Sequence, residues 1–251
     1  MRAICRYLLD LGAQVRVGDS PTFGKGVEIA GKIGLTEALA DLPVPIINLG
    51  RPKLVRLSFG GWAPISREAL ENDLIVNVPR LKAHHQMRIT AAVKNVYGCI
   101  TGLYKPLLHL SYGDRGGRFR RMLYGIWDTL PPSFSLLDAV TAMHVHGPNN
   151  GQPYSLGLLA ASESPVALDS TVMSILGIEP RDAPMWQIAL KLGLPGAKLE
   201  EITYPLEPPE LFDGTGFQCP ADLFPISFRP LRVCFHWVKR WRAHKRDQVG
   251  L

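Results

Sequence analysis

The amino-acid sequence predicts an α/β fold, with a mixed, mainly parallel sheet and helices on both of its faces. Short apolar runs of strand length alternate along the chain with segments whose apolar residues recur at helical spacing. Turn-forming glycine, proline and aspartate separate the two kinds of segment. With 251 residues, 46% of them hydrophobic and 20% charged, the chain can bury one sizeable core. Such alternation is typical of helices that pack on a sheet containing parallel strands.

The chain opens with a predicted helix over residues 2–11, which Gly12 ends, and a strand over residues 14–18. In an α/β domain such a helix crosses over from an earlier strand, so we expect it to flank an exposed sheet edge. Residues 27–39 predict a second helix, weakened by two glycines. The elements that follow are strands over 45–49 and 53–57, a short helix over 67–71, a buried central strand over 73–78, and a helix over 90–97 with Thr90 near its cap.

The second half of the chain continues the same pattern. The predicted elements are a helix over 119–130, a strand over 135–140, a tight turn over 147–151, a strand over 156–161, and helices over 165–176 and 186–192. Pro165 suits the first turn of its helix, where proline is tolerated. We therefore place one α/β domain at residues 1–204, a proline-rich linker at 205–228 and a basic amphipathic tail at 229–251.

The net charge of +6 belongs to the tail. Seven of the 28 Lys and Arg residues, and one of the 22 Asp and Glu residues, lie from Arg229 onward, so the rest of the chain is neutral. A surface for sequence-specific nucleic acid binding is therefore not expected. Residues 230–246 predict an amphipathic helix with Val233, Trp237 and Trp241 on one stripe, which suits an anionic membrane surface or an acidic partner such as a redox protein. The alternative is that both tryptophans pack on the body while the charges stay solvated.

The four cysteines lie far apart in the sequence. No two of them have C-x-x-C spacing, so we expect no zinc ribbon and no iron–sulfur cluster from the chain's own cysteines. No apolar run approaches the roughly 20 residues that span a bilayer, and the first residues lack the pattern of a signal peptide. These features predict a cytoplasmic protein, peripheral on the inner membrane face if the tail binds lipid.

Polar residues gather in three loops that follow predicted strands. In open α/β sheets ligands bind beyond the carboxyl ends of strands, where loops lead into helix starts. The three loops carry, in order, Asp19 and Ser20; Arg80, Lys82, His84, His85 and Arg88; and Asp138, followed by His144 and His146. We expect Asp19, Ser20, Arg80, Thr90 and Asp138 to bind the ligand.

The second loop is the densest, and it leads into a helix start, so it favours an anionic ligand. Lys94 and Asn95 lie one turn inside that helix, after three apolar residues. Burial would lower the pKa of Lys94 and make it a base or a nucleophile. With Lys82 and His84 these two residues are the candidate catalytic set. The alternative is a solvated basic loop with a surface lysine.

Histidines from two loops are candidate metal ligands. His84, His144 and His146 suit zinc, iron or nickel, although isolated histidines more often cap helices or form hydrogen bonds. The sequence has no phosphate-binding P-loop, no dinucleotide-binding glycine motif and no serine-hydrolase elbow. No particular cofactor is therefore predicted from the residues.

Several motifs occur in an order that resembles the domain-of-unknown-function 362 family of bacteria and archaea. They are Val-Gly-Asp-Ser-Pro over 17–21, Asn-Val-Pro-Arg-Leu-Lys-Ala-His over 77–84, Thr-Ala-Ala-Val-Lys-Asn-Val-Tyr-Gly over 90–98, Asp-Ala over 138–139, Gly-Pro over 147–148, Gly-Gln-Pro over 151–153, and Ser-Pro-Val-Ala-Leu-Asp over 164–169. The resemblance covers residues 1 to about 204. It implies a relation to iron–sulfur proteins, because some members carry a ferredoxin-like module.

The resemblance also implies site residues. Lys82 and His84 match the family's lysine–x–histidine, and Lys94 and Asn95 match its lysine–asparagine pair. Asp19, Asp138 and Asp169 match its acidic positions. Family members begin with a further strand and helix containing lysine–proline–asparagine, so the resemblance implies an N-terminally short chain.

Three functions remain open from the sequence. The first is an enzyme that binds an anionic or metal-bound small molecule at the strand-end loops. The second is a non-catalytic binding or scaffold protein. The third is a peripheral membrane protein that uses its basic tail. Bound metal in the purified protein would separate the first from the others.

Overall fold

The largest sheet of the computed structural model is built around one long strand, β8 (Ser133–His144). The structure describes residues 1–113 and 117–224. Strands β5 (Ile75–Asn77) and β6 (Arg80–His84) both pair with β8 in parallel, one after the other along its length. Strand β7 (Arg88–Thr90) runs antiparallel to β6, and β9 (Gln152–Ser162) runs antiparallel to β8.

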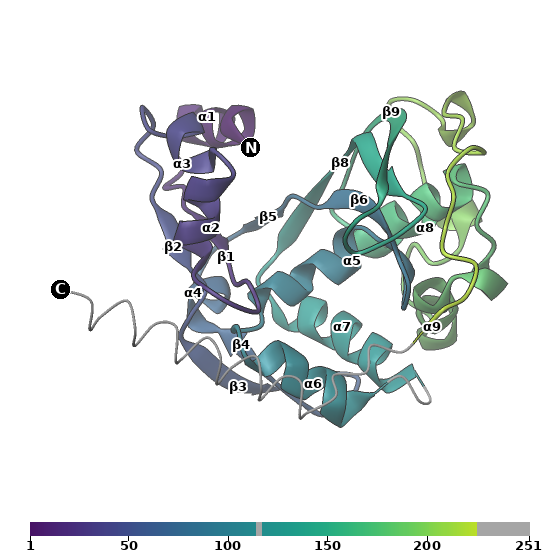
Figure 1. Ribbon diagram of the computed structural model, residues 1–251, viewed down its shortest axis with the longest axis horizontal. Helices are drawn as coiled ribbons and strands as arrows, with labels where there is room; N and C mark the ends of the chain where they lie inside the picture. Colours follow the sequence, from purple (N-terminus) through teal and green to yellow (C-terminus); the bar gives the residue numbers. More distant parts are fainter. Residues whose placement is uncertain (114–116, 225–251) are drawn as a thin grey trace.

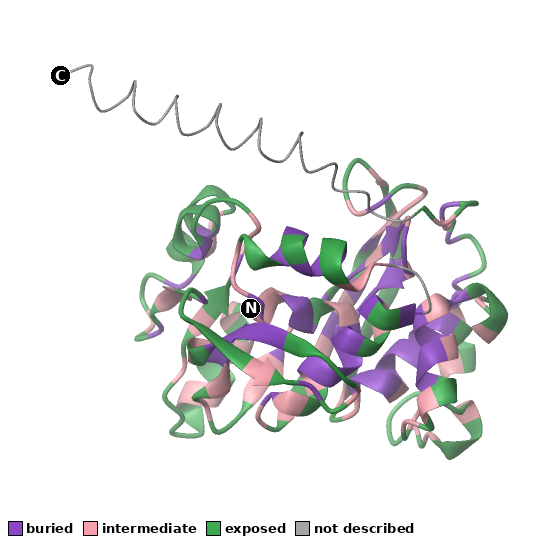
Figure 2. Cartoon of the chain, turned by 90° about the horizontal axis from the view of Figure 1, so that it is seen from below, coloured by how far each residue is buried: buried purple, intermediate pink, exposed green. Residues whose placement is uncertain are grey.

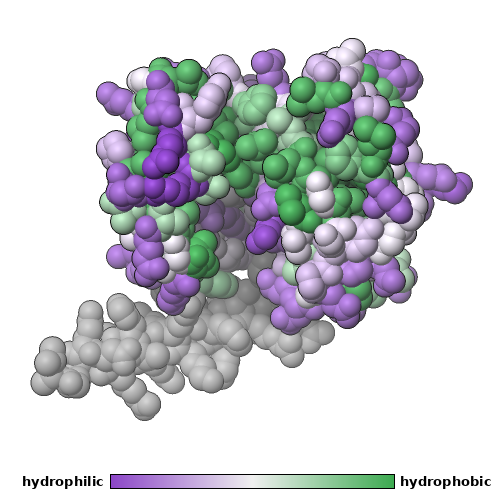
Figure 3. Space-filling model, turned by 90° about the horizontal axis from the view of Figure 1, so that it is seen from above, coloured by the Kyte–Doolittle hydropathy of each residue, from purple (hydrophilic) through white to green (hydrophobic). Residues whose placement is uncertain are grey.

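The N-terminal segment forms a separate small lobe, at the upper left of Figure 1. Strands β1 (Val17–Asp19) and β2 (Ile46–Asn48) pair in parallel, and neither has another strand neighbour among the described residues. The helices of the lobe are α1 (Arg2–Asp10), α2 (Gly26–Lys32) and α3 (Leu35–Ala38). Gly34, with a φ of 74°, separates α2 from α3, as the weak points of the sequence predict. Figure 3 shows the surface hollowed between this lobe and the body.

An antiparallel hairpin follows the lobe. Strands β3 (Pro52–Arg56) and β4 (Trp62–Ser66) lead into α4 (Arg67–Leu70). Helix α6 (Tyr104–Tyr112) lies beside the hairpin, because the Tyr112 hydroxyl donates to the Trp62 carbonyl at 2.9 Å and accepts from its amide at 2.8 Å.

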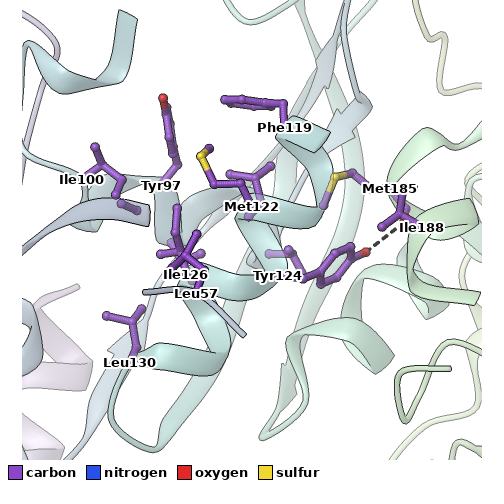
Figure 4. Close-up of a cluster of buried hydrophobic side chains, with 14 of the residues drawn as sticks. Leu57, Tyr97, Ile100, Phe119, Met122, Tyr124, Ile126, Leu130, Met185 and Ile188 are labelled. Carbon is purple, nitrogen blue, oxygen red and sulfur yellow. Dashed lines mark hydrogen bonds between the residues drawn. The ribbon is translucent and has the colours of Figure 1, made fainter. Parts of the chain in front are cut away.

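Two apolar cores flank α5 (Ala92–Asn95) and the short 3-10 helix η1 (Val96–Cys99). The first core centres on α7 (Arg118–Thr129). In Figure 4, Tyr97 and Phe119 lie at one end of this core and the Tyr124 hydroxyl points to the Met185 carbonyl, 3.0 Å away. The second core packs α8 (Pro165–Ile175) against one face of the large sheet. Figure 2 shows buried residues concentrated in this central region.

The remaining elements run around α8. They are α9 (Pro184–Leu192) and the 3-10 helices η3 (Pro180–Asp182), η4 (Leu199–Glu201) and η5 (Pro209–Leu211). The segment over 205–224 is irregular apart from η5, and Phe217 from this segment is buried in the second core. The predicted tail helix over 230–246 lies outside the described residues.

The α/β class and the mixed sheet with helices are confirmed. Among the described strands, parallel and antiparallel pairings are equally many. Several elements differ from the sequence interpretation. Residues 80–84 and 88–90 form strands where a loop leading into a helix was predicted, and the strand over 62–66 and the helix over 104–112 were not predicted. The strand predicted as central, β5, pairs only with β8 among the described strands. No helix in the described part of the chain is long and apolar enough to cross a membrane.

Candidate functional site

The functional side chains of β6 alternate with core residues. Successive side chains of a strand point to opposite faces. Leu81 and Ala83 belong to the second apolar core, so Lys82 and His84 face the other side of the sheet. Thr90 pairs directly with Lys82 across β6 and β7, and therefore lies on the same face as Lys82. The Thr90 hydroxyl is buried and has no hydrogen-bond partner within the described structure.

Helix α5 places Lys94 beside this face, and a residue far along the chain fixes its start. The Asp169 carboxylate of α8 accepts hydrogen bonds from the amides of Ala92, at 2.7 Å, and Val93, at 3.1 Å. Thr90 lies next to the helix cap, as predicted, but it ends β7 and Ala91 occupies the cap position, so the helix begins two residues later than predicted. Burial raises the pKa of Asp169 to about 7, against the opposing effect of the two amides.

The Lys94 amine lies among aromatic rings. Its Nζ is 4.3 Å from the centre of the Tyr97 ring and 5.8 Å from that of Phe119. His109 stacks on Phe119 with a centre-to-centre distance of 4.0 Å and meets the Tyr97 ring edge-on. Burial, together with the positive charges of Lys105 and Lys82, lowers the pKa of Lys94 to about 7. At neutral pH a large fraction of this amine is therefore unprotonated.

His84 is a neutral hydrogen-bond donor. Its Nδ1 accepts a hydrogen bond from the Gln86 amide at 3.1 Å, so the proton of the neutral ring is assigned to Nε2. Burial, followed by the charges of Lys94 and Lys82, lowers the pKa of His84 to about 3. The ring therefore stays uncharged at neutral pH, and burial also lowers the pKa of Lys82.

Lys105, which the sequence analysis missed, joins the site to the N-terminal lobe. This lysine is buried and donates to the Ser20 carbonyl, while the Gly102 amide donates to the Ser20 hydroxyl at 2.7 Å. The Asp19 carboxylate lies near Gly98, since a Cβ added at Gly98 would be 3.3 Å from its Oδ1, and it is close enough to Lys105 to affect that amine. Burial lowers the pKa of Lys105, and the charge of Asp19 opposes that effect.

Other predicted site residues have different surroundings. Asn95 donates to the Asn77 side chain at 2.7 Å, and Asn77 in turn donates to the Ala92 carbonyl, so this pair braces α5. Arg80 forms an exposed ion pair with Asp138 at 3.7 Å, on β6 and β8. These three predicted side chains therefore have protein partners already.

The predicted metal ligands do not gather around one point. His144 packs against Tyr154 and Phe217, and its Nδ1 accepts from the Gln218 amide at 3.2 Å. His146 is exposed. Over residues 1–113 and 117–224, no group of three or more His, Cys, Asp or Glu side chains has the arrangement of a metal site.

Two surface hollows, of about 630 and 680 Å³, lie elsewhere. Trp127 and Phe134 line the first, while Arg56 and Trp62 line the second. Neither contains Lys82, His84 or Lys94. The buried chemistry of the chain therefore does not coincide with these two hollows.

The fold and the site together define an α/β protein with a donor-rich cluster between a mixed sheet and a short helix. Residues 1–174 match the family described as "Domain of unknown function (DUF362)", and the chain belongs to this family. The chain is also 34% identical over 233 residues to the "Thylakoid-associated protein sll1697" of Synechocystis sp.. The aligned region covers 92% of this chain and 72% of that protein. No solved structure matches the chain. Neither match names an iron–sulfur protein, so that relation stays a prediction.

Proposed function

We propose that the face of the sheet bearing Lys82, His84 and Thr90 binds an oxyanionic small molecule, and that Lys94 acts on it as a base or nucleophile. The observation that carries this proposal is the grouping of donors without acidic partners. No ion pair joins Lys82 or Lys94 to a carboxylate within the described residues. The buried Thr90 hydroxyl has no partner either. Buried donors are costly when unpaired, and a carboxylate or phosphate would satisfy them.

The roles follow from the protonation states. Lys82 and the His84 Nε2–H supply hydrogen bonds to an anion, and the neutral fraction of Lys94 supplies a lone pair. Asp19 acts indirectly, because it lies near Lys105 and helps to keep that ammonium charged. The result is an anion site with one basic amine at its side.

Thermal unfolding of the full chain with acetate, phosphate, pyruvate and citrate tests the proposal. A ligand at 100 times its dissociation constant stabilises the native state by about 2.7 kcal/mol. Lys82→Met should abolish the stabilisation, whereas Lys191→Met, which removes an exposed lysine on α9, should leave it unchanged. Absence of stabilisation by every anion, or equal responses of the two variants, would contradict the proposal. Anion binding without turnover would favour the non-catalytic binding protein.

A second proposal is peripheral association with an anionic membrane. Helix α6 and its cap residue Leu103 expose apolar side chains at helical spacing, those of Leu103, Tyr104, Leu107 and Leu110. A relative is named as thylakoid-associated, and the sequence beyond residue 228 is rich in tryptophan, lysine and arginine. An apolar stripe and a basic segment are the two features that interfacial binding requires.

Co-sedimentation with phosphatidylglycerol and phosphatidylcholine vesicles tests this second proposal. Binding to the anionic vesicles should fall on deletion of residues 229–251 and on Leu107→Glu. Leu190→Glu, at an exposed leucine of α9, serves as the control and should bind normally. Unchanged binding in the deletion variant and in Leu107→Glu would exclude both surfaces as the membrane contact.

A further inference from the structure

The neighbours of the Lys94 amine are aromatic rings and cations, and burial among them favours its uncharged, nucleophilic form. Tyr97, Phe119 and His109 form an aromatic group with ring centres 4.0 to 5.5 Å apart, and the Lys94 Nζ lies over two of these rings. The other charged neighbours that affect its protonation are Lys105 and Lys82, which are cations. Aromatic faces attract a cation without supplying the proton acceptor that a carboxylate would be.

The residues around the Lys94 amine differ in exposure. Lys94 on α5 and Lys82 on β6 are half-buried as whole residues, although the protein encloses the Lys94 amine itself. His84 and Thr90 between and beside them are buried. A small molecule held by the donors of β6 and β7 would therefore lie next to the amine of α5.

Resting on the anion site of the preceding section, we propose that Lys94 forms an imine with a small oxo-carboxylate, of the 2-oxo acid class. Lys82, the Thr90 hydroxyl and the His84 Nε2–H bind the carboxylate, and the Lys94 Nζ attacks the neighbouring carbonyl carbon. An oxo acid combines the two features that this site addresses separately, an oxyanion and an electrophilic carbon. Phosphate or a simple carboxylate would leave the Lys94 amine without a role.

The reaction balances without an oxidant. The Lys94 lone pair forms the new C–N bond, the carbonyl oxygen takes up the two amine protons, by way of solvent or neighbouring donors, and leaves as water. The product is an imine, and its protonated form is a cation over the Tyr97 ring, where the face of the ring stabilises it. Formation needs the free base. Burial and the charges of Lys105 and Lys82 lower the pKa of Lys94. The other titratable groups that face Lys94 are His84 from β6, Tyr97 from η1 and His109 from α6.

Reductive trapping of the full chain tests the inference. Protein incubated with glyoxylate or pyruvate and cyanoborohydride at pH 7 is digested, and the modified lysines are identified by peptide mass spectrometry. The free-base fraction of an amine of pKa about 7 exceeds that of an ordinary lysine by about a thousandfold at this pH. We therefore expect Lys94 to be labelled at least about a hundredfold faster than Lys191.

Two comparisons make the outcome decisive. Lys94→Arg keeps a cation but no nucleophilic amine, and should lose the fast label, whereas Lys191→Arg should keep it. Acetaldehyde is an aldehyde like glyoxylate but lacks the carboxylate, so its preference for Lys94 over Lys191 should be smaller than that of glyoxylate, and acetate should slow the labelling of Lys94 by glyoxylate. Labelling of Lys94 no faster than that of Lys191 would overturn the imine inference.

The anion experiment separates this failure from failure of the proposed function. If anions stabilise the protein while Lys94 stays unlabelled, the anion site stands and the imine is wrong. If no anion stabilises the protein and acetaldehyde prefers Lys94 over Lys191 as strongly as glyoxylate does, the oxo-carboxylate proposal and the anion site are both wrong.

Discussion

Replacing Lys94 by methionine should stabilise the protein at neutral pH, by an amount that depends on pH in a defined way. The Lys94 pKa falls from 10.5 to about 7 on folding, which means that the native structure disfavours the protonated amine by about 5 kcal/mol. At pH 7 roughly 4 kcal/mol of this cost is present. Methionine has no charge to bury but loses the contact with the Tyr97 ring. We therefore expect a net gain of about 2 to 4 kcal/mol.

The sign of the pH dependence provides the sharper test. Between pH 7 and 10.5 the unfolded chain still binds the Lys94 proton and the native state does not. The free energy of unfolding of the wild type therefore rises by about 1.4 kcal/mol for each increase of one pH unit. Lys94→Met lacks this contribution, and the gap between the two proteins should close as the pH rises. Urea unfolding at pH 6, 7, 8, 9 and 10 measures the gap, with Lys191→Met as the control. A gap that is constant over this range would refute the reasoning.

Three further outcomes are expected from urea unfolding. In the wild type, Asp169 should lower the free energy of unfolding by up to about 4 kcal/mol as the pH rises from about 4 to 7, because the native state holds a proton there that the unfolded chain has lost. Asp169→Asn should lack this pH dependence, which a series of unfolding measurements over this range tests. Tyr124→Phe should cost about 1 kcal/mol, because it leaves the buried Met185 carbonyl without its hydroxyl donor, and an unchanged midpoint would contradict this. Gly147→Ala should cost about 3 kcal/mol, because a Cβ would overlap the Ala83 carbonyl, and soluble, equally stable protein would show that the loop adapts.

The apolar pattern predicted most elements of the fold because those elements bury one side. It failed at residues 80–84, where basic side chains suggested a loop. The alternation of Arg80, Lys82 and His84 with Leu81 and Ala83 is nevertheless a strand pattern with a period of two. On the polar face of this strand Arg80 is exposed, whereas Lys82 and His84 are withdrawn from solvent near Lys94 of α5, and local sequence does not reveal that difference.

The candidate site was predictable only where its residues come from neighbouring segments. Lys82, His84 and Lys94 follow one another closely in the sequence, and the structure brings their charges within mutual influence. Lys105 was not predictable, because its partner Ser20 lies 85 positions earlier. The missed helix α6 has Pro106 in its first turn, and recognising that turn as a helix start would have brought Lys105 into consideration.

The four-residue length of α5 has a consequence for the order in which the site becomes structured. A single helical turn is not stable alone, since its first hydrogen bond cannot repay the backbone entropy. Its two leading amides depend on Asp169, 77 and 76 positions away. Lys94 therefore acquires its helical position only when α8 has docked on the sheet, and loses it whenever that contact opens. The protection of the Ala92 and Val93 amides against hydrogen exchange should consequently match the protection of the amides of α8. Opening of a helix distant in the sequence then determines how long the Lys94 amine keeps its position.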